Sequence, residues 1–269
     1  MINLHLQTVP ARQGLAWIRH GITVFRRRPL AMSSLCSFAV MLVLVLPQLI
    51  PPLGLIVPLL PPLISLGFML ATHEVLQGNS PKIGVFVAPL RITAERRKSQ
   101  LLLCLFYALV QLLIMLITTS LFGDSLDRLS DAKAAGGDQT AMMAALSDPR
   151  LRNGMLALLL LEGLVSIPFW HAPALVHWGG QGVAQALFSS TVALWRNRGA
   201  FALNALGFAG AVMTVALLLA PIVGLLGPQL GTLVSVLSTI VLSTVFYSSL
   251  YFSFVDCFLS GSPDKLTLK

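Results

Sequence analysis

The sequence predicts an all-α polytopic membrane protein, with six transmembrane helices in one bundle and amphipathic helices at the membrane interface. Of its 269 residues, 56% are hydrophobic and only 10% are charged, and the mean hydropathy is +0.83. Soluble domains carry about 25% charged residues. One soluble core could not cover so many apolar side chains, so lipid is expected to cover the rest. Two tracts of 45 and 57 residues lack Asp, Glu, Lys and Arg altogether. One span needs about 20 apolar residues, so each tract predicts a hairpin of two spans.

Prolines mark the turns of both hairpins, and two further spans flank a polar loop at 123–152. The first turn contains so many prolines that its second helix is expected to be short. Any non-helical part should then be buried in protein or lie at the interface. The prolines are Pro47, Pro51, Pro52, Pro58, Pro61 and Pro62 in the first turn, and Pro221 and Pro228 in the second. The six expected spans are 30–50, 56–76, 101–122, 154–178, 200–222 and 231–257.

The distribution of basic residues predicts the orientation in a bacterial inner membrane. With six spans, 14 of the 18 Lys and Arg residues fall on the side of both termini, and four fall in the 123–152 loop. Cytoplasmic segments carry the excess of Lys and Arg, so both termini should be cytoplasmic and the 123–152 loop extracytoplasmic. The formal net charge of +8 therefore indicates orientation and contact with anionic lipid, and nucleic acid is not an expected partner.

A threefold internal repeat is suggested when segments 14–29, 84–99 and 184–199 are placed in register. The expected units cover 1–78, 79–178 and 179–269 of a single membrane domain, each an amphipathic helix followed by a transmembrane hairpin. The alternative is that any helix entering a membrane from the cytoplasm ends in basic residues. The aligned basic residues, which are the candidate ligands for anionic lipid headgroups, are Arg26, Arg96 and Arg196, with Arg28, Lys98 and Arg198.

The first copy shows the amphipathic pattern most clearly. Its apolar face and the arginine stripe beside it recur at helical spacing, as expected for a helix lying in the membrane interface. The same helix could also pack against its own hairpin, and the two interpretations are compatible. The apolar face is Leu15, Ile18, Ile22 and Phe25, and the stripe is Arg12, Arg19 and Arg26.

Glu162 is the acidic residue that lies well inside a predicted span. A carboxylate in a membrane is costly and is a functional candidate by default. It could couple protons or bind a substrate. The more conservative interpretation is a neutral carboxyl that hydrogen-bonds to polar groups on other spans, such as Gln111 or Asn204.

No cofactor or metal site is expected. Cys36, Cys104 and Cys257 are far apart in the sequence and lie in apolar segments, which argues against disulfides and zinc. His171 and His177 are six residues apart, which is not the spacing of a helical metal pair.

The fourth span ends in a sequence that resembles an uncharacterised family of proteobacterial inner-membrane proteins. The resemblance rests on Ala-Pro-Ala-Leu-Val at 172–176 and Trp-Arg-Asn at 195–197. It implies no activity and no catalytic residues. The helix layout is also similar, more distantly, to the membrane domain of some glycerophosphodiester phosphodiesterases.

The same stretch predicts a bent elbow on the cytoplasmic side. Two prolines should break the fourth span there, and two tryptophans should anchor it at the interface. The elbow could be a binding site or only a turn in the chain. Its residues are Pro168, Trp170, His171, Pro173, His177 and Trp178.

These patterns favour a non-enzymatic protein that organises lipid or a partner protein at the cytoplasmic face. The expected partners are membrane lipids, chiefly anionic, with a membrane-protein partner or a second copy of the chain as further options. The alternative is a small transporter or permease that uses Glu162. Transport paths commonly need several ionisable groups, and here Glu162 stands alone within the spans.

Overall fold

The computed structural model describes residues 4–134 and 147–258, and every regular element in this part is helical. Five segments are long and apolar enough to cross a membrane, and six when one bent pair counts as a single span. The predicted all-α polytopic membrane bundle is therefore confirmed. The centre of the expected extracytoplasmic loop (135–146) and the C-terminal segment 259–269 lie outside the described residues.

The chain divides into two compact units. Unit 1 contains Met1–Cys104 and Pro168–Lys269, and unit 2 contains Leu105–Ile167. Unit 1 is built around helix α10 (Arg198–Phe258), which Gly227 divides into two arms by adopting φ 79°. A glycine tolerates this left-handed conformation without a steric cost. The apolar arms, Arg198–Val223 and Gln229–Phe258, agree with the last two expected spans.

Helix α1 (Gln13–Arg27) packs mainly against α10 and only marginally against its own hairpin. Its buried stripe is Gly14, Trp17, Gly21 and Val24, whereas Leu15 on the expected apolar face is exposed. Gly14 and Gly21 allow the close crossing, because a Cβ atom at Gly14 would overlap the Ala200 carbonyl oxygen. The expectation that α1 packs against its own hairpin therefore holds only marginally, because the small-residue stripe fits α10.

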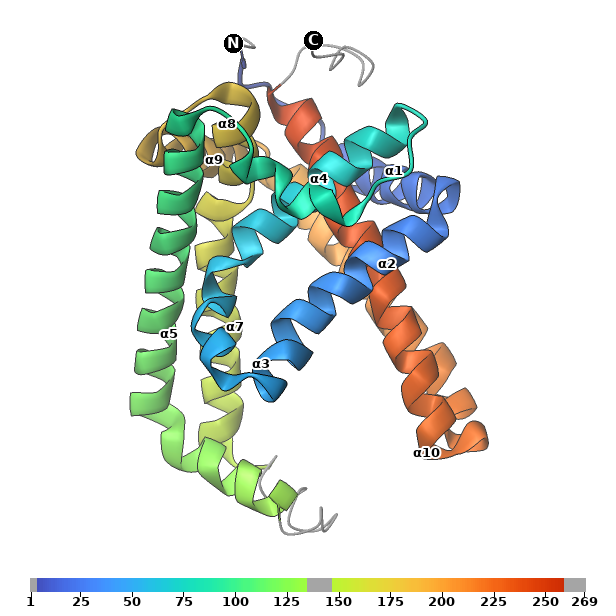
Figure 1. The fold of residues 1–269 in the computed structure, drawn as a ribbon. Helices are drawn as coiled ribbons and strands as arrows, with labels where there is room; N and C mark the ends of the chain where they lie inside the picture. The colour runs from blue at the N-terminus through green and yellow to red at the C-terminus, as the bar shows by residue number, and fades with distance from the viewer. Residues whose placement is uncertain (1–3, 135–146, 259–269) are drawn as a thin grey trace. The chain divides into compact units, whose positions relative to one another are not determined.

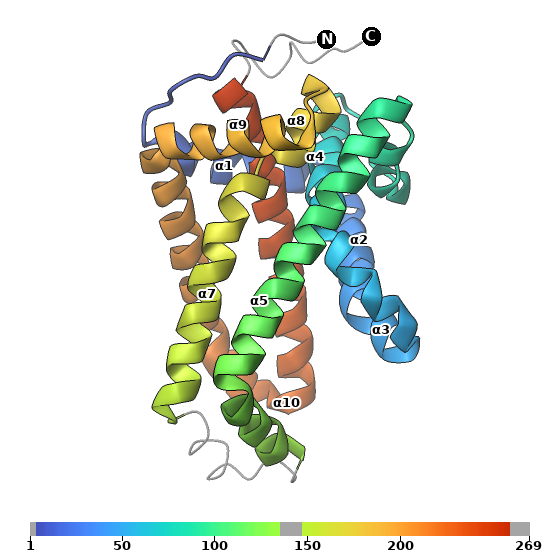
Figure 2. The ribbon, with the colours of Figure 1, turned by 90° about the vertical axis from the view of Figure 1, so that its left-hand side faces the viewer.

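Helix α9 (Val183–Arg196) is the second amphipathic helix of unit 1. Figures 1 and 2 show that α1 and α9 run across the end of α10 remote from Gly227. Helix α8 (Ala172–Gly179) precedes α9 at the same end. Helices that lie across a membrane-spanning hairpin at its end have the geometry of interfacial helices.

The first hairpin is irregular because of its prolines. It comprises α2 (Pro29–Val40), a π turn η1 (Met41–Val45) and α3 (Leu46–Leu49), followed by two 3₁₀ turns and α4 (Pro61–Leu76). The 3₁₀ turns are η2 (Pro51–Leu55) and η3 (Val57–Leu59), and they meet α4 at a bend of 64°. The second helix is short, as predicted, but the segment before it is exposed or half-buried and not buried in protein, so of the two expected places for it the interface remains a prediction.

The expected middle amphipathic helix at 84–99 is absent from the structure. Two 3₁₀ turns, η4 (Ile83–Phe86) and η5 (Ala88–Leu90), stand in its place. Pro89 lacks a backbone N–H and disfavours a helix through this segment. The first and third copies do share a local order, in which an amphipathic helix, a one-residue break and an apolar helix follow one another. The threefold repeat and its three units stay predictions.

Unit 2 is formed by the greater part of α5 (Ala94–Ala134) and α7 (Pro149–Phe169). The loop expected from residue 123 is therefore helical up to Ala134, because no proline interrupts the polar continuation of the span. Figure 1 shows α5 bending before it ends. Within unit 2, Gly154 lets α7 approach α5, since a Cβ atom there would lie 2.6 Å from Phe122 Cγ.

Candidate functional site

All six candidate lipid ligands lie in unit 1, at the ends of helices. Arg26 and Arg196 are in the last turns of α1 and α9. Arg28 and Arg198 each follow two residues later, where the next apolar helix begins. Arg96 and Lys98 lie near the start of α5. Five of the six are exposed and Arg96 is half-buried. In the part of the chain that the structure describes, none of them is paired with a carboxylate.

Two of these arginines bind backbone carbonyls and thereby fix the chain. Arg96 Nη1 donates to the His177 carbonyl at 3.0 Å, and Arg28 Nη2 donates to the Gly78 carbonyl at 2.9 Å. Arg96 therefore lies at the C-terminal end of α8, where a cation is favoured by the helix dipole. Arg26, Lys98, Arg196 and Arg198 are left as the candidates with freely exposed charge.

Helix α9 presents an apolar face with exposed aromatic rings beside its arginines. Phe188 is 70% exposed and Trp195 is 71% exposed. The Arg198 guanidinium carbon lies 5.7 Å from the centre of the Trp195 ring, within cation–π range. Exposed aromatic rings next to basic groups are typical of a helix at the membrane–water interface. In the sequence, Trp195 stands out only as part of the Trp-Arg-Asn motif, which does not mark it as an anchor.

The burial of Trp178 contradicts its predicted role as an interface anchor, whereas Trp170 is half-buried and its predicted role stays a prediction. Trp178 is only 6% exposed and stacks on Phe254, with ring centres 5.2 Å apart. Trp170 meets Phe201 and Phe246 edge-on. The reason is the break at residues 170–171, which turns the chain into α8 and directs both indoles toward α10. Pro168 lies in the last turn of α7 and Pro173 in the first turn of α8, as expected for a broken span.

The two elbow histidines take part in hydrogen bonds within the fold, which indicates a structural role. His171 is fully buried, its backbone N–H donates to Ser190 Oγ at 3.0 Å, and its Nε2 lies 3.0 Å from Ser253 Oγ. The Ser253 hydroxyl donates to the Leu250 carbonyl, so it accepts from a protonated Nε2. His177 offers its carbonyl to Arg96. Among the described residues, no group of three His, Cys, Asp or Glu could hold a metal ion.

Asp256 and Asn197 hold the N-terminal part of the chain on α10. The Asp256 carboxylate accepts hydrogen bonds from Gln13 Nε2 and Trp17 Nε1, each at 2.7 Å. Asn197 Oδ1 accepts from the Val9 N–H at 2.8 Å, and its Nδ2 donates to the Gln7 carbonyl at 3.0 Å. Neither role was predicted from the sequence. Asp256 had one available signal, as the charge that ends a 57-residue uncharged tract.

Glu162 has the polar partner that the sequence suggested. Gln111 Nε2 donates to Glu162 Oε2 at 2.9 Å and to Tyr107 Oη at 2.8 Å, which forms a small polar cluster between α5 and α7 in unit 2. Asn204, the other suggested partner, lies on α10 in unit 1. The cluster can hold a carboxyl inside a membrane without a cation beside it.

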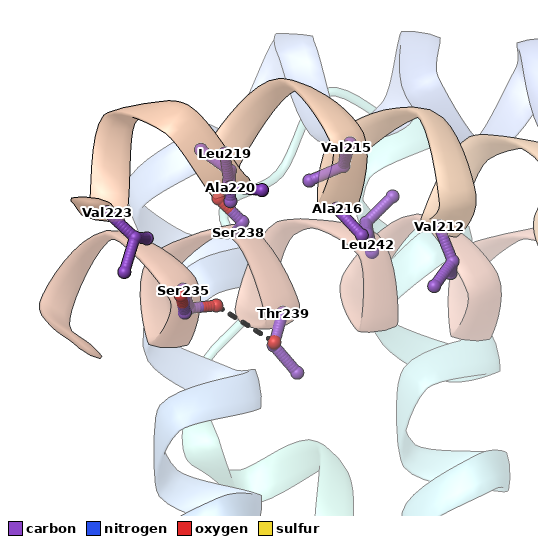
Figure 3. Close-up of a pocket in the computed structure, with 10 residues that line it drawn as sticks. All are labelled: Val212, Val215, Ala216, Leu219, Ala220, Val223, Ser235, Ser238, Thr239 and Leu242. Atoms are coloured by element: carbon purple, nitrogen blue, oxygen red, sulfur yellow. Dashed lines mark hydrogen bonds between the residues drawn. The ribbon is translucent and has the colours of Figure 1, made fainter. Parts of the chain in front are cut away.

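A groove of about 350 Å³ lies between the two arms of α10 (Figure 3). The hydroxyls along it bond within their own helix, as Thr239 Oγ1 does to the Ser235 carbonyl at 2.9 Å. Such hydroxyls are already satisfied and leave a mostly apolar wall. The groove is lined by Val212, Val215, Ala216, Leu219, Ala220, Val223, Ser235, Ser238, Thr239 and Leu242.

Comparison with known proteins identifies a relative along nearly the whole chain. No protein-family model matches the chain, and no solved structure matches it. A protein of Burkholderia thailandensis that bears the name "probable inner membrane protein" is 30% identical over 262 residues, which cover 97% of this chain and 96% of the relative. The apolar helices of the structure agree with that name. The chain belongs to the same family of multi-pass inner-membrane proteins as this Burkholderia protein.

Proposed function

We propose that this protein is a non-enzymatic membrane protein that binds anionic phospholipid at the cytoplasmic face of the inner membrane. The observation that carries the proposal is the exposed surface of α9, where Trp195 and Phe188 lie beside Arg196 and Arg198 without a carboxylate partner. Aromatic side chains can enter the acyl region while the guanidinium groups meet phosphate. Helix α1 and the residue before it add exposed arginines at 12, 19 and 26 at the same end of unit 1.

The alternative for these basic residues is that they only set the orientation of the spans. Orientation depends on how many Lys and Arg a segment carries and hardly on their exact position. A lipid site depends on position, because the charges must act together with an apolar anchor. Each Lys or Arg near an anionic surface contributes about 1 kcal/mol, so two neighbouring arginines should change lipid affinity by roughly 30-fold.

The test is native mass spectrometry of protein purified in mild detergent. Arg196→Gln with Arg198→Gln should lose most of the anionic lipid that the wild type retains. Arg150→Gln with Arg152→Gln is the matched control, because it removes the same charge at the same spacing from exposed positions in unit 2. The control should retain the lipid. Equal retention in both double variants, each correctly inserted, would refute the proposal.

Arg96→Gln belongs in the same experiment as a separate variant. Its guanidinium holds the end of α8, so we expect a loss of thermal stability with little loss of bound lipid. The loss should be of the size of one charge-assisted hydrogen bond, about 1.5–3 kcal/mol. A thermal denaturation series in detergent measures it.

A permease is the second candidate, and the Glu162 cluster supports it. If the carboxyl only fills the gap between α5 and α7, Glu162→Gln should be nearly silent, since an amide oxygen can still accept from Gln111. The free energy of unfolding should then change by less than about 0.5 kcal/mol. If the Glu162→Gln variant has normal abundance in the membrane but the phenotype that depends on the gene is lost, proton coupling and a permease are favoured. Glu162→Leu is the companion variant that removes the acceptor.

A further inference from the structure

We infer that the tip of the first hairpin, residues 49–60, stays inside the hydrocarbon core of the bilayer, in contact with lipid acyl chains. The hairpin would then enter and leave the membrane through the same face. The tip contains only Leu, Ile, Val, Pro and Gly. Leu49 is 73% exposed and Leu55 is 84% exposed, so the tip presents large apolar side chains outward. This inference depends on the first hairpin alone and not on headgroup binding at α9.

The backbone of the tip is suited to hydrocarbon because several of its N–H donors are paired locally. Three N–H groups pair with the carbonyl three residues earlier, from Leu53 to Ile50, from Ile56 to Leu53 and from Leu59 to Ile56, at 2.9–3.1 Å. Pro51, Pro52 and Pro58 have no N–H to satisfy. An unpaired donor in the bilayer core costs several kcal/mol, and these pairings avoid that cost.

The regular helix of the returning arm, α4, is too short to cross the bilayer by itself. Helix α4 has 16 residues, which give about 24 Å at 1.5 Å per residue, whereas the hydrocarbon core is about 30 Å thick. The 64° bend at its start turns the 3₁₀ segment away from the α4 axis. The descending arm, α2 to α3, runs obliquely to the arms of α10, and in both views its tip stops short of the turn between these arms (Figures 1 and 2).

A hydrogen bond joins the two ends of the first hairpin, here called its feet, at the basic end of unit 1. Arg28, directly before α2, donates to the carbonyl of Gly78, two residues after α4. Arg26 and Arg27 lie at the same foot, in the last turn of α1. The feet are therefore held at one membrane surface while the apolar tip points away from it, which is the arrangement of a re-entrant hairpin.

The experiment measures the depth of the tip in reconstituted vesicles. Leu55→Cys and Leu30→Cys carry the same small fluorophore, and the wild type processed in parallel gives the background from Cys36, Cys104 and Cys257. Leu30 is the matched control, because it is 86% exposed and lies at the foot of the same hairpin. Nitroxide groups on lipid headgroups or in the middle of acyl chains then quench the fluorescence.

The expected result is that mid-chain nitroxide quenches the label at position 55 more strongly than headgroup nitroxide does. The label at position 30 should show the reverse order. Stronger headgroup quenching at position 55, or quenching by aqueous iodide, would show that the tip crosses to the opposite surface and would overturn the inference. Absence of quenching by either lipid would also overturn it, because protein such as a second copy would then cover the tip.

Discussion

Trp17→Ala should lower the free energy of unfolding in detergent by about 3–5 kcal/mol, the range for removing a large aromatic side chain from a packed core. Trp17 is fully buried between α1 and α10, and its ring lies 5.1 Å from that of Phe201. The substitution also removes one of the two hydrogen bonds that the structure gives the Asp256 carboxylate. Thermal denaturation of the purified protein measures the loss.

Trp195→Ala is the matched control for this prediction. It removes the same side chain from a site that is 71% exposed, so its effect on unfolding in detergent should stay below about 1 kcal/mol. Equal losses for the two variants would mean that α1 is not packed on α10 as described. Trp17→Phe separates the contribution of apolar packing to the free energy of unfolding from that of the hydrogen bond to Asp256. It keeps most of the apolar contact and removes only the hydrogen bond.

Gly14→Ala should be destabilising by about 1–3 kcal/mol, although alanine normally favours a helix more than glycine does. A Cβ atom at this position overlaps the Ala200 carbonyl and lies 2.8 Å from the Asn204 backbone nitrogen. These neighbours are backbone atoms, which cannot move aside as a flexible side chain could. Helix α1 must therefore shift away from α10 and lose part of its buried contact.

Gly210→Ala is the control for this prediction, because its expected effect on stability has the opposite sign. Nothing lies within 4 Å of a Cβ atom at Gly210, which is also inside a helix. The alanine should leave stability unchanged or raise it by up to about 1 kcal/mol. A stabilised or unchanged Gly14→Ala variant would contradict the close crossing of α1 over α10.

The spans were predictable because they depend on local composition. Uncharged tracts, prolines and the charges at their ends located the hairpins, and Gly227 lies between the two expected spans of α10. The helical extension of α5 to Ala134 was missed because a polar sequence without proline is compatible with both a loop and a helix. The partner of α1 was missed because Gly14 and Gly21 meet residues nearly 200 positions or more away.

The candidate site was predictable in residue type but not in exposure. Trp170 and Trp178 have the composition of interface anchors, yet the break at residues 170–171 directs them inward, while Trp195 faces outward. Arg28 and Arg96 look equivalent to Arg26 and Arg196 in sequence, but only tertiary structure places the Gly78 and His177 carbonyls beside them. Glu162 and Gln111 were paired correctly, since an intramembrane carboxyl needs a polar partner.

For the proposed lipid site to face the cytoplasm, the ends of α1 and α9 and the start of α5 must lie at the cytoplasmic surface. Reporter fusions along the chain test this most directly. Alkaline phosphatase should be active when fused after residue 138, in the loop outside the described residues, and inactive after residues 90, 190 and 269. A fluorescent protein that matures only in the cytoplasm should give the reverse pattern. Cytoplasmic activity after residue 138, or phosphatase activity after residue 190, would contradict the orientation and with it the proposed lipid site.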